Sequence, residues 1–285
     1  MYRLTSGMAE NSLPSLAETI RTYDLRADKS LGQHFLLDPH LLARIAQAAN
    51  LPDGVNVIEV GPGPGGLTRA LLDTKAKHIT AIEYDKRAVA AITSLAATTS
   101  RLSIIEADAL KADLISLVPA PRAIVANLPY NIGTLLLINW LQQAREFHSM
   151  TLMFQLEVAE RICAQPDSSA YGRVSVLTQW LCEVTMLMRI PAGAFAPPPK
   201  VESALIRVIP RAEQPPAAEI KLMERLTAAA FGQRRKMLRG ALKPLGGEAL
   251  CLEAGIEPQR RAETLSVAEF VKLMRTIQAR QATPA

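Results

Sequence analysis

Three glycines and two acidic side chains have the spacing of a nucleotide-binding loop. Gly61, Gly63 and Gly66 follow an apolar burst at 55–60 and open a helical pattern. Glu83 ends the next apolar burst, and Asp108 follows the third. Glycines allow a ligand to approach the backbone, and a carboxylate at the second strand end can hold two ribose hydroxyls. The pattern predicts a site for an adenosine-containing cofactor, and the alternative is a tight turn that binds nothing.

The residues around these glycines discriminate between cofactors. Pro62 and Pro64 remove N–H donors that a pyrophosphate needs at a helix start, and Glu59 stands just before the loop. S-adenosylmethionine has no phosphate and carries a sulfonium and an ammonium, which carboxylates stabilise. The loop therefore favours S-adenosylmethionine over NAD.

A second set of candidate residues follows the fourth apolar burst, at Asn127-Leu128-Pro129-Tyr130. The exocyclic amine of adenine is a weak nucleophile because its lone pair is delocalised into the ring. The Asn127 side-chain oxygen and the Leu128 or Pro129 carbonyl can accept its N–H protons and stabilise the positive charge that develops on nitrogen. Tyr130 can stack on the base. Motifs of this type mark amino-group methyltransferases, and the alternative is a capped turn with a packing tyrosine.

These residues need a sheet that brings strand ends together. Apolar bursts at 55–60, 78–82, 102–105, 123–126, 150–155, 184–190 and 204–209 alternate with helical patterns. This alternation predicts a mainly parallel, Rossmann-like α/β sheet, with the last two strands as an antiparallel pair. Together with the motifs above and the family resemblance given below, it implies a sheet of the class I S-adenosylmethionine methyltransferase type. The division that we expect is an N-terminal extension at 1–28, a Rossmann-like domain at 29–210 and a small all-α domain at 211–285. Helices are predicted there over 217–231, 234–242, 248–254 and 266–279.

Charge is distributed unevenly along the 285 residues. Residues 1–210 carry 19 Lys/Arg and 19 Asp/Glu, whereas residues 211–285 carry 13 and 8, so the whole excess of +5 lies in the last quarter. A basic end on a neutral body predicts an anionic partner, with nucleic acid before a membrane surface. The widely spaced cysteines and the lack of an apolar leader predict a cytoplasmic protein, and the histidine spacing predicts no metal site.

The chain resembles the bacterial ribosomal RNA adenine N6,N6-dimethyltransferases that modify small-subunit rRNA. The resemblance covers nearly everything from Leu25 to about Thr276. It is carried by these motifs in order: Lys29-Ser-Leu-Gly-Gln-His-Phe-Leu36, Glu59-Val-Gly-Pro-Gly63, Asn127-Leu-Pro-Tyr130-Asn-Ile, Gln155-Leu-Glu-Val-Ala-Glu-Arg161, Ala170-Tyr-Gly-Arg173, Phe195-Ala-Pro-Pro-Pro-Lys200-Val and Phe231-Gly-Gln-Arg-Arg-Lys236.

This resemblance implies methyl transfer from S-adenosylmethionine to N6 of two adjacent adenosines near the 3′ end of 16S rRNA in the 30S particle, and a role in small-subunit biogenesis. The cofactor residues that it implies are His34, Leu36, Gly61, Gly63, Glu83, Asp108 and Asn127. The family usually has Asn where this chain has His34, and a protonated imidazole is unfavourable beside a sulfonium, so we expect a backbone contact there. Phe195 is expected to stack on the base opposite Tyr130.

The implied RNA contacts are basic. They are Arg234, Arg235, Lys236 and Arg239, with Arg173 and Lys200 nearer the cleft. The protein is expected to act as a monomer. Two alternatives remain open: a large-subunit rRNA adenine methyltransferase that confers macrolide resistance, and a non-catalytic assembly factor. The triple-proline arm and Ala170-Tyr-Gly-Arg173 favour the small-subunit enzyme.

Overall fold

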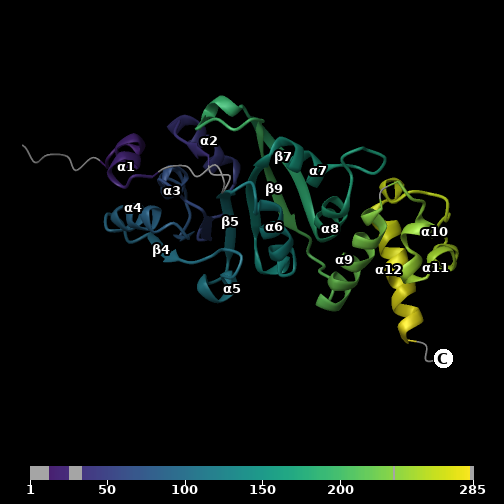
Figure 1. Cartoon of the computed structure of the whole chain (residues 1–285). Helices are drawn as coiled ribbons and strands as arrows, with labels where there is room; N and C mark the ends of the chain where they lie inside the picture. Colours follow the sequence, from purple (N-terminus) through teal and green to yellow (C-terminus); the bar gives the residue numbers. More distant parts are fainter. Residues whose placement is uncertain (1–12, 26–33, 234, 283–285) are drawn as a thin grey trace, which may run out of the picture.

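The computed structural model describes residues 13–25, 34–233 and 235–282, and within them the chain forms one central sheet. Figure 1 shows this sheet between helices that cover both of its faces. The first five strands in spatial order are parallel, the sixth runs antiparallel to both of its neighbours, and the seventh therefore runs in the same direction as the first five. In spatial order the strands are β4 (Leu102–Glu106), β3 (His78–Glu83), β2 (Asn56–Val60), β5 (Arg122–Asn127), β6 (Ser149–Gln155), β9 (Ser203–Pro210) and β7 (Cys182–Ile190). The predicted Rossmann-like sheet and its antiparallel end are confirmed.

Alternation along the strands divides the core into two layers. In β2, Val57 packs into one buried cluster and Ile58 into the other. In β5, Val125 and Ile124 divide in the same way. Side chains of successive strand residues point to opposite faces, so both faces of an apolar strand need helical cover.

One face is covered by helices from the first half of the chain. These are α2 (Pro39–Ala48), α3 (Gly66–Leu72) and α4 (Lys86–Ala96). The short helix α1 (Leu16–Thr22) precedes them and begins at a capping box between Ser15 and Glu18. The other face is covered by α5 (Leu114–Leu117), α6 (Gly133–Leu141), α7 (Leu156–Cys163) and α8 (Arg173–Leu181).

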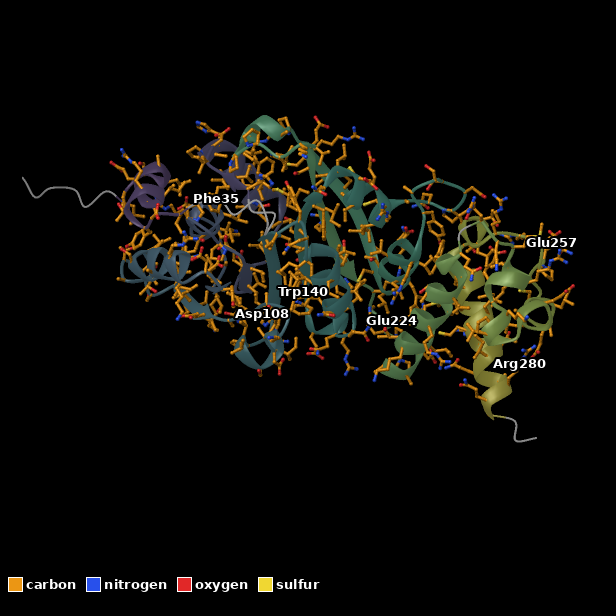
Figure 2. All side chains as sticks on the ribbon, in the orientation of Figure 1. Phe35, Asp108, Trp140, Glu224, Glu257 and Arg280 are labelled. Atoms are coloured by element: carbon orange, nitrogen blue, oxygen red, sulfur yellow. The ribbon has the colours of Figure 1, made fainter. Side chains whose placement is uncertain are left out.

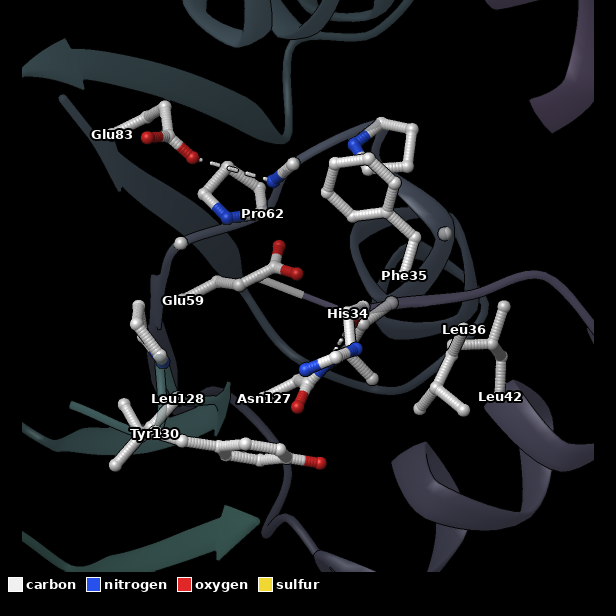
Figure 3. Close-up of a pocket in the computed structure, with 16 residues that line it drawn as sticks. His34, Phe35, Leu36, Leu42, Glu59, Pro62, Glu83, Asn127, Leu128 and Tyr130 are labelled. Atoms are coloured by element: carbon white, nitrogen blue, oxygen red, sulfur yellow. Dashed lines mark hydrogen bonds between the residues drawn. The ribbon is translucent and has the colours of Figure 1, made fainter. Parts of the chain in front are cut away.

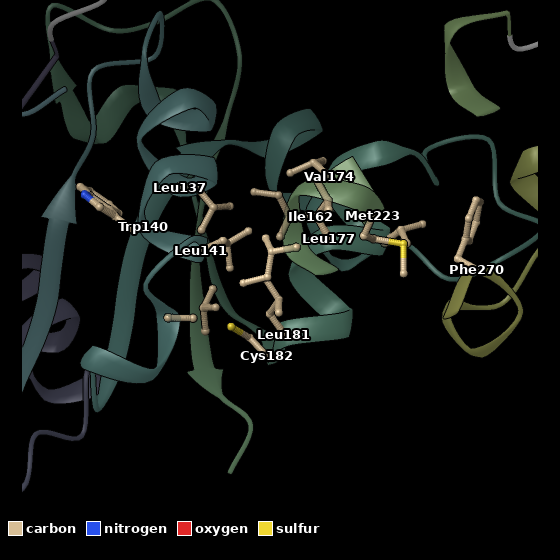
Figure 4. Packing of buried hydrophobic residues seen from close by; sticks show 14 of the residues in the cluster. Leu137, Trp140, Leu141, Ile162, Val174, Leu177, Leu181, Cys182, Met223 and Phe270 are labelled. Carbon is tan, nitrogen blue, oxygen red and sulfur yellow. The ribbon is translucent and has the colours of Figure 1, made fainter. Parts of the chain in front are cut away.

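The C-terminal helices form a lobe that shares this second core. They are α9 (Ala217–Gly232), α10 (Leu238–Ala241), α11 (Gly247–Glu253) and α12 (Val267–Ala282). Figure 4 shows the packing from Leu141 of α6 through Leu181 of α8 to Met223 of α9, with Phe270 of α12 beyond. The Gln142 amide also donates to Glu224 at 2.8 Å, and Figure 2 marks Glu224 where the lobe meets the body. One buried cluster therefore runs from the sheet into the lobe.

The prediction of a helix over 234–242 is wrong for residues 235–237. Residues 235 and 236 form a turn and a bend, Met237 makes an isolated bridge with Arg261, and the helix begins only at Leu238. The Leu238 N–H also donates to the Arg260 carbonyl at 2.8 Å. These bonds to a segment far along the chain hold the backbone out of helical geometry.

A two-stranded pair escaped prediction. β1 (Phe35–Leu36) and β8 (Phe195–Ala196) are antiparallel, with Leu36 opposite Phe195. This pair joins the loop before α2 to the proline-rich arm. Short 3₁₀ turns complete the described structure at Ala144–Glu146, Ala192–Ala194, Lys243–Leu245 and Ala262–Thr264. No helix in the described ranges has the length and apolar character needed to cross a membrane.

Candidate active site

Two adjoining cavities lie at the carboxyl ends of β2, β3, β4 and β5. The inner cavity, of about 80 Å³, is lined by residues that include His34, Leu36, Glu59, Asn127 and Tyr130 (Figure 3). The outer cavity, of about 330 Å³, is lined by Tyr84 and Asp108 among others. Gly61, Glu83 and Pro129 border both cavities. The strand ends of the sheet therefore bring together the glycine loop, the acidic residues and the motif after β5.

The glycine loop has a backbone conformation that suits glycine. Gly61 and Gly63 have φ values of +69° and +52°, in the left-handed region. A Cβ on Gly63 would lie 3.0 Å from the ring of Phe35. The Gly63 N–H donates to Glu83 Oε2 at 3.3 Å, which ties the loop to the end of β3. Position 63 therefore requires glycine because of its backbone angle and because there is no space for a Cβ.

Glu83 is held in place by main-chain donors. Its Oε1 accepts from the N–H groups of Tyr84 and Asp85 at 2.8 and 2.9 Å. Burial raises the pKa of this carboxyl, and the three backbone donors oppose the rise. Tyr84 beside it is 75% exposed at the rim of the outer cavity. Glu83 therefore presents a fixed carboxylate where the two cavities meet.

Glu59 is more deeply buried and less well paired. Its residue is 1% exposed, and Oε2 has no hydrogen-bond partner among the described residues. Burial raises its pKa to about 8, and the nearby Glu83 carboxylate adds to the rise. A buried acceptor without a partner is unfavourable unless a ligand satisfies it. Glu59 is the site residue whose role the glycine spacing alone does not reveal, although its place before the loop and its charge are visible in the sequence.

Asp108 lies at the end of β4 on the border of the outer cavity. Its Oδ1 accepts from the Leu110 N–H at 3.0 Å, and its Oδ2 lies 3.7 Å from the exposed ammonium of Lys111. The turn after β4 thereby holds Asp108 on the same side of the sheet as Glu83.

The orientation of the Asn127 carboxamide follows from its contact. Its Nδ2 donates to the main-chain oxygen of His34 at 3.1 Å. A carbonyl can only accept, so the nitrogen must face His34 and the side-chain oxygen of Asn127 must face elsewhere. Leu128 is buried, and Pro129 borders both cavities. The Tyr130 hydroxyl pairs with Ser203 Oγ at 2.5 Å, and burial raises the Tyr130 pKa.

Phe195 packs in the same buried cluster as Leu36. It is buried within β8 and is not among the described residues that line this cavity. The ring of His34 contacts both aromatic residues, with its centroid 5.2 Å from that of Tyr130 and 6.4 Å from that of Phe195. The expected stacking of Phe195 on the base stays a prediction.

The basic residues do not gather in one place. Lys200 is exposed three residues before Ser203, which contacts Tyr130, and Arg173 is exposed at the start of α8. Arg235, Lys236 and Arg239 are exposed around the start of α10. Figure 1 places α10 at the opposite end of the molecule from α3 and α4. Arg234 lies outside the described residues, and among those described no group of His, Cys, Asp and Glu could hold a metal ion.

Solved structures resemble the fold over most of its length. A dimethyladenosine transferase from Plasmodium falciparum is 26% identical, has a TM-score of 0.73, and is matched over 87% of this chain and 98% of its own. The 23S rRNA methyltransferase ErmE is 28% identical, has a TM-score of 0.64, and is matched over 86% and 99%. Since both share this architecture, the fold alone does not identify which rRNA is modified.

Sequence relatives are closer. Proteins named ribosomal RNA small subunit methyltransferase A are similar to this chain. The one from Gluconobacter oxydans is 58% identical, with 92% of this chain and 87% of the relative covered. The one from Rhodospirillum rubrum is 51% identical, with 94% of both chains covered. The family model for ribosomal RNA adenine dimethylase matches residues 25–279. The chain belongs to the ribosomal RNA adenine dimethylase family.

Proposed function

We propose that this protein is an S-adenosylmethionine-dependent enzyme that methylates N6 of two adjacent adenosines near the 3′ end of small-subunit rRNA. The observation that carries the proposal is the oriented Asn127 carboxamide beside Tyr130, next to the acidic glycine-loop cavities. Relatives over 50% identical that are named as small-subunit methyltransferases support the choice of rRNA.

The residues present suit a cationic cofactor. Glu59 offers a buried oxygen that lacks a partner, and Glu83 adds a second carboxyl where the cavities meet. Pro62 and Pro64 leave few N–H donors for a phosphate. Glu59, His34 and Leu36 would surround the methionine end, Glu83 would hold the ribose, and Asp108 would accept the adenine amino group. When bound, S-adenosylmethionine supplies an electrophilic methyl group.

The chain's own residues prepare the nucleophile. The His34 carbonyl holds the Asn127 nitrogen, so the Asn127 oxygen is free to accept an N–H of the target amine. The Pro129 carbonyl already accepts from Gly133 and Ile132, at 3.0 and 3.2 Å, which leaves the Leu128 carbonyl as the better second acceptor. Accepting both N–H protons stabilises the positive charge that grows on nitrogen during attack. Tyr130 would stack on the base, which must leave its own stack to enter.

The substrate that we propose is rRNA within the 30S particle, bound by a cytoplasmic monomer that contributes to small-subunit biogenesis. Lys200 would contact RNA near the cavities, Arg173 would contact it from the start of α8, and Arg234, Arg235, Lys236 and Arg239 would contact phosphates from the lobe. The base would enter at the side of Tyr130, and Phe195 would stack on its opposite face.

The test is transfer of label from S-adenosylmethionine to 30S particles that lack the modification. We expect dimethyladenosine at two adjacent rRNA positions. Label in 50S particles instead would support the large-subunit alternative. Cofactor binding without transfer to either particle would support the non-catalytic alternative.

Asn127→Ala is the matching catalytic variant. Loss of the acceptor oxygen should lower the rate by about a hundredfold or more, as for removal of one preorganised group at a developing charge. Thermal unfolding should change little because Asn127 is only partly buried. The control is His40→Ala, which changes an exposed residue of α2, and its rate should match that of the unmodified protein. Equal rates for Asn127→Ala and the control would remove the role assigned to Asn127.

A further inference from the structure

The side chain of His34 makes contacts that a cofactor-binding role does not require. Its ring lies 5.2 Å from the Tyr130 centroid with planes 30° apart, and it meets Phe195 edge-on. Its Nδ1 lies 2.8 Å from the main-chain oxygen of Pro197. Three segments distant in sequence therefore converge on one imidazole.

The contact with Pro197 determines which nitrogen carries the proton. A carbonyl oxygen only accepts, so Nδ1 must be the donor in this pair. The neutral ring therefore carries its hydrogen on Nδ1. The pairing of β1 with β8 supports this bond, since it sets Leu36 opposite Phe195 two residues away. The ring is thus held by a hydrogen bond on one edge and by Tyr130 on its face.

There is no room for a base between these two rings. Contacting aromatic atoms lie about 3.5 Å apart, so an inserted purine needs rings separated by about 7 Å. The observed centroid distance is 5.2 Å. Figure 3 shows the His34 ring and the Asn127 carboxamide over the same face of Tyr130. A base that stacks on this face and presents its amine to Asn127 needs the position of the imidazole.

We propose that the His34 imidazole is a placeholder for the target adenine. In the free protein the imidazole stacks on Tyr130, and the entering base displaces it. The inference rests on the proposed function for the identity of the base. Displacement requires rotation of the His34 side chain and loss of its bond to Pro197. The His34 carbonyl, which orients Asn127, stays in place because it belongs to the main chain.

The placeholder reduces apparent affinity for RNA. When only a fraction of molecules has the base position open, the apparent dissociation constant rises by the inverse of that fraction. One ring stack and one hydrogen bond together are sufficient to hold about nine molecules in ten closed. His34→Ala should then lower KM for 30S particles roughly tenfold. His34→Asn, which lacks a ring, should act in the same direction.

The kinetic test has controls. His40→Ala should leave KM as it is. An unchanged or increased KM in both His34 variants, with the Tm of each near that of the unmodified protein, would overturn the placeholder and make His34 a supporting wall of the base site. Absence of transfer by the unmodified protein would instead contradict the proposed function.

A second measurement needs no substrate. In the free protein, the ring protons of His34 should show an upfield NMR shift caused by the Tyr130 ring. That shift should disappear in Tyr130→Leu, whereas the resonances of His40 should not move. A His34 resonance without any upfield shift would overturn the inference even where methyl transfer is demonstrated, and so its failure is separate from that of the proposed function.

Discussion

Glu59 combines deep burial with an oxygen that has no partner in the described structure. Its pKa of about 8 means that the carboxyl is mostly protonated at neutral pH before a ligand arrives. A cation beside it favours the charged form, so binding and ionisation are linked. Glu59 therefore becomes the negatively charged partner of the cofactor only when the cofactor binds.

Cofactor binding is expected to release a proton from Glu59 between about pH 5 and 8. In the free protein the group stays protonated up to pH about 8, and the ammonium of the ligand lowers that pKa. Affinity should rise with pH through this window and then level off. Calorimetry in two buffers of different ionisation enthalpy measures the release. Glu59→Gln should bind more weakly and release no proton, and equal enthalpies for the unmodified protein in both buffers would contradict the linkage.

The raised pKa of Glu59 also makes the stability of the folded protein depend on pH. An unfolded Glu59 loses its proton near its ordinary value of 4.5, whereas the folded one keeps it to about 8. The stabilising contribution is complete below pH 4.5 and is lost as pH rises to about 8. Other carboxyls add their own pH dependence, so the Glu59→Gln difference isolates this one.

Sequence reasoning reached most of these residues because each stands at a strand end marked by an apolar burst. Gly61, Glu83, Asp108 and Asn127 border the two cavities as the alternation of strands and helices implies. The contact of the His34 ring with Tyr130 was not predictable, since it depends on a pairing between residues about 160 positions apart in the chain. The expected backbone contact of His34 with the cofactor stays a prediction, and the structure shows its carbonyl accepting from Asn127 instead.

Among the elements, the turn from β2 to α3 is constrained at Gly63 in three ways. Gly63 has positive φ, approaches Phe35 and donates to Glu83. Three separate requirements thus converge on one position, and each connects the loop to another part of the cofactor site.

Gly63→Ala and Gly54→Ala form a matched pair. Both residues have positive φ, at +52° and +78°, so both variants pay a backbone cost of about 1–2 kcal/mol. A Cβ on Gly54 meets nothing within 4 Å, whereas a Cβ on Gly63 meets Phe35. Gly63→Ala should therefore have the lower Tm and weaker cofactor binding, and Gly54→Ala should bind normally. Equal cofactor affinities in the two variants would argue against the loop's role.

The strands were predictable from their apolar bursts, whereas two local elements were not. β1 and β8 are each two residues long, too short for any periodicity to reveal. The segment before Leu238 has helical composition, yet its pairing with Arg260 and Arg261 overrides that preference. Local propensity is a weak signal where distant backbone groups compete for the same hydrogen bonds.

At the scale of the whole molecule, charge and chemistry occupy different places. The excess of +5 belongs to residues 211–285, and the acidic cavities belong to the sheet. On the proposed function, the neutral body would bind the cationic cofactor and the basic lobe would bind phosphates, so we expect that each can be altered without the other.

Reversal of Arg235 and Lys236 to Glu tests this separation. Binding to 30S particles should weaken. The slope of log binding constant against log salt concentration should become less negative by about one for each lost phosphate contact. Cofactor affinity should stay the same. The control reverses Lys75 and Lys77, which are exposed before β3, at the end of that strand remote from Glu83. Equal effects of the two double variants on the salt dependence would show that net charge alone matters.

The buried cluster that joins the sheet to the lobe has a geometric consequence. Packed side chains join α6 through α8 to α9 (Figure 4), and the same buried cluster includes Leu238 of α10. We therefore expect the distance between the Asn127 site and α10 to be fixed. On the proposed function, an rRNA fold would be a substrate only when its unpaired adenines and its phosphate anchor stand that distance apart, so a single length would report whether the particle has assembled.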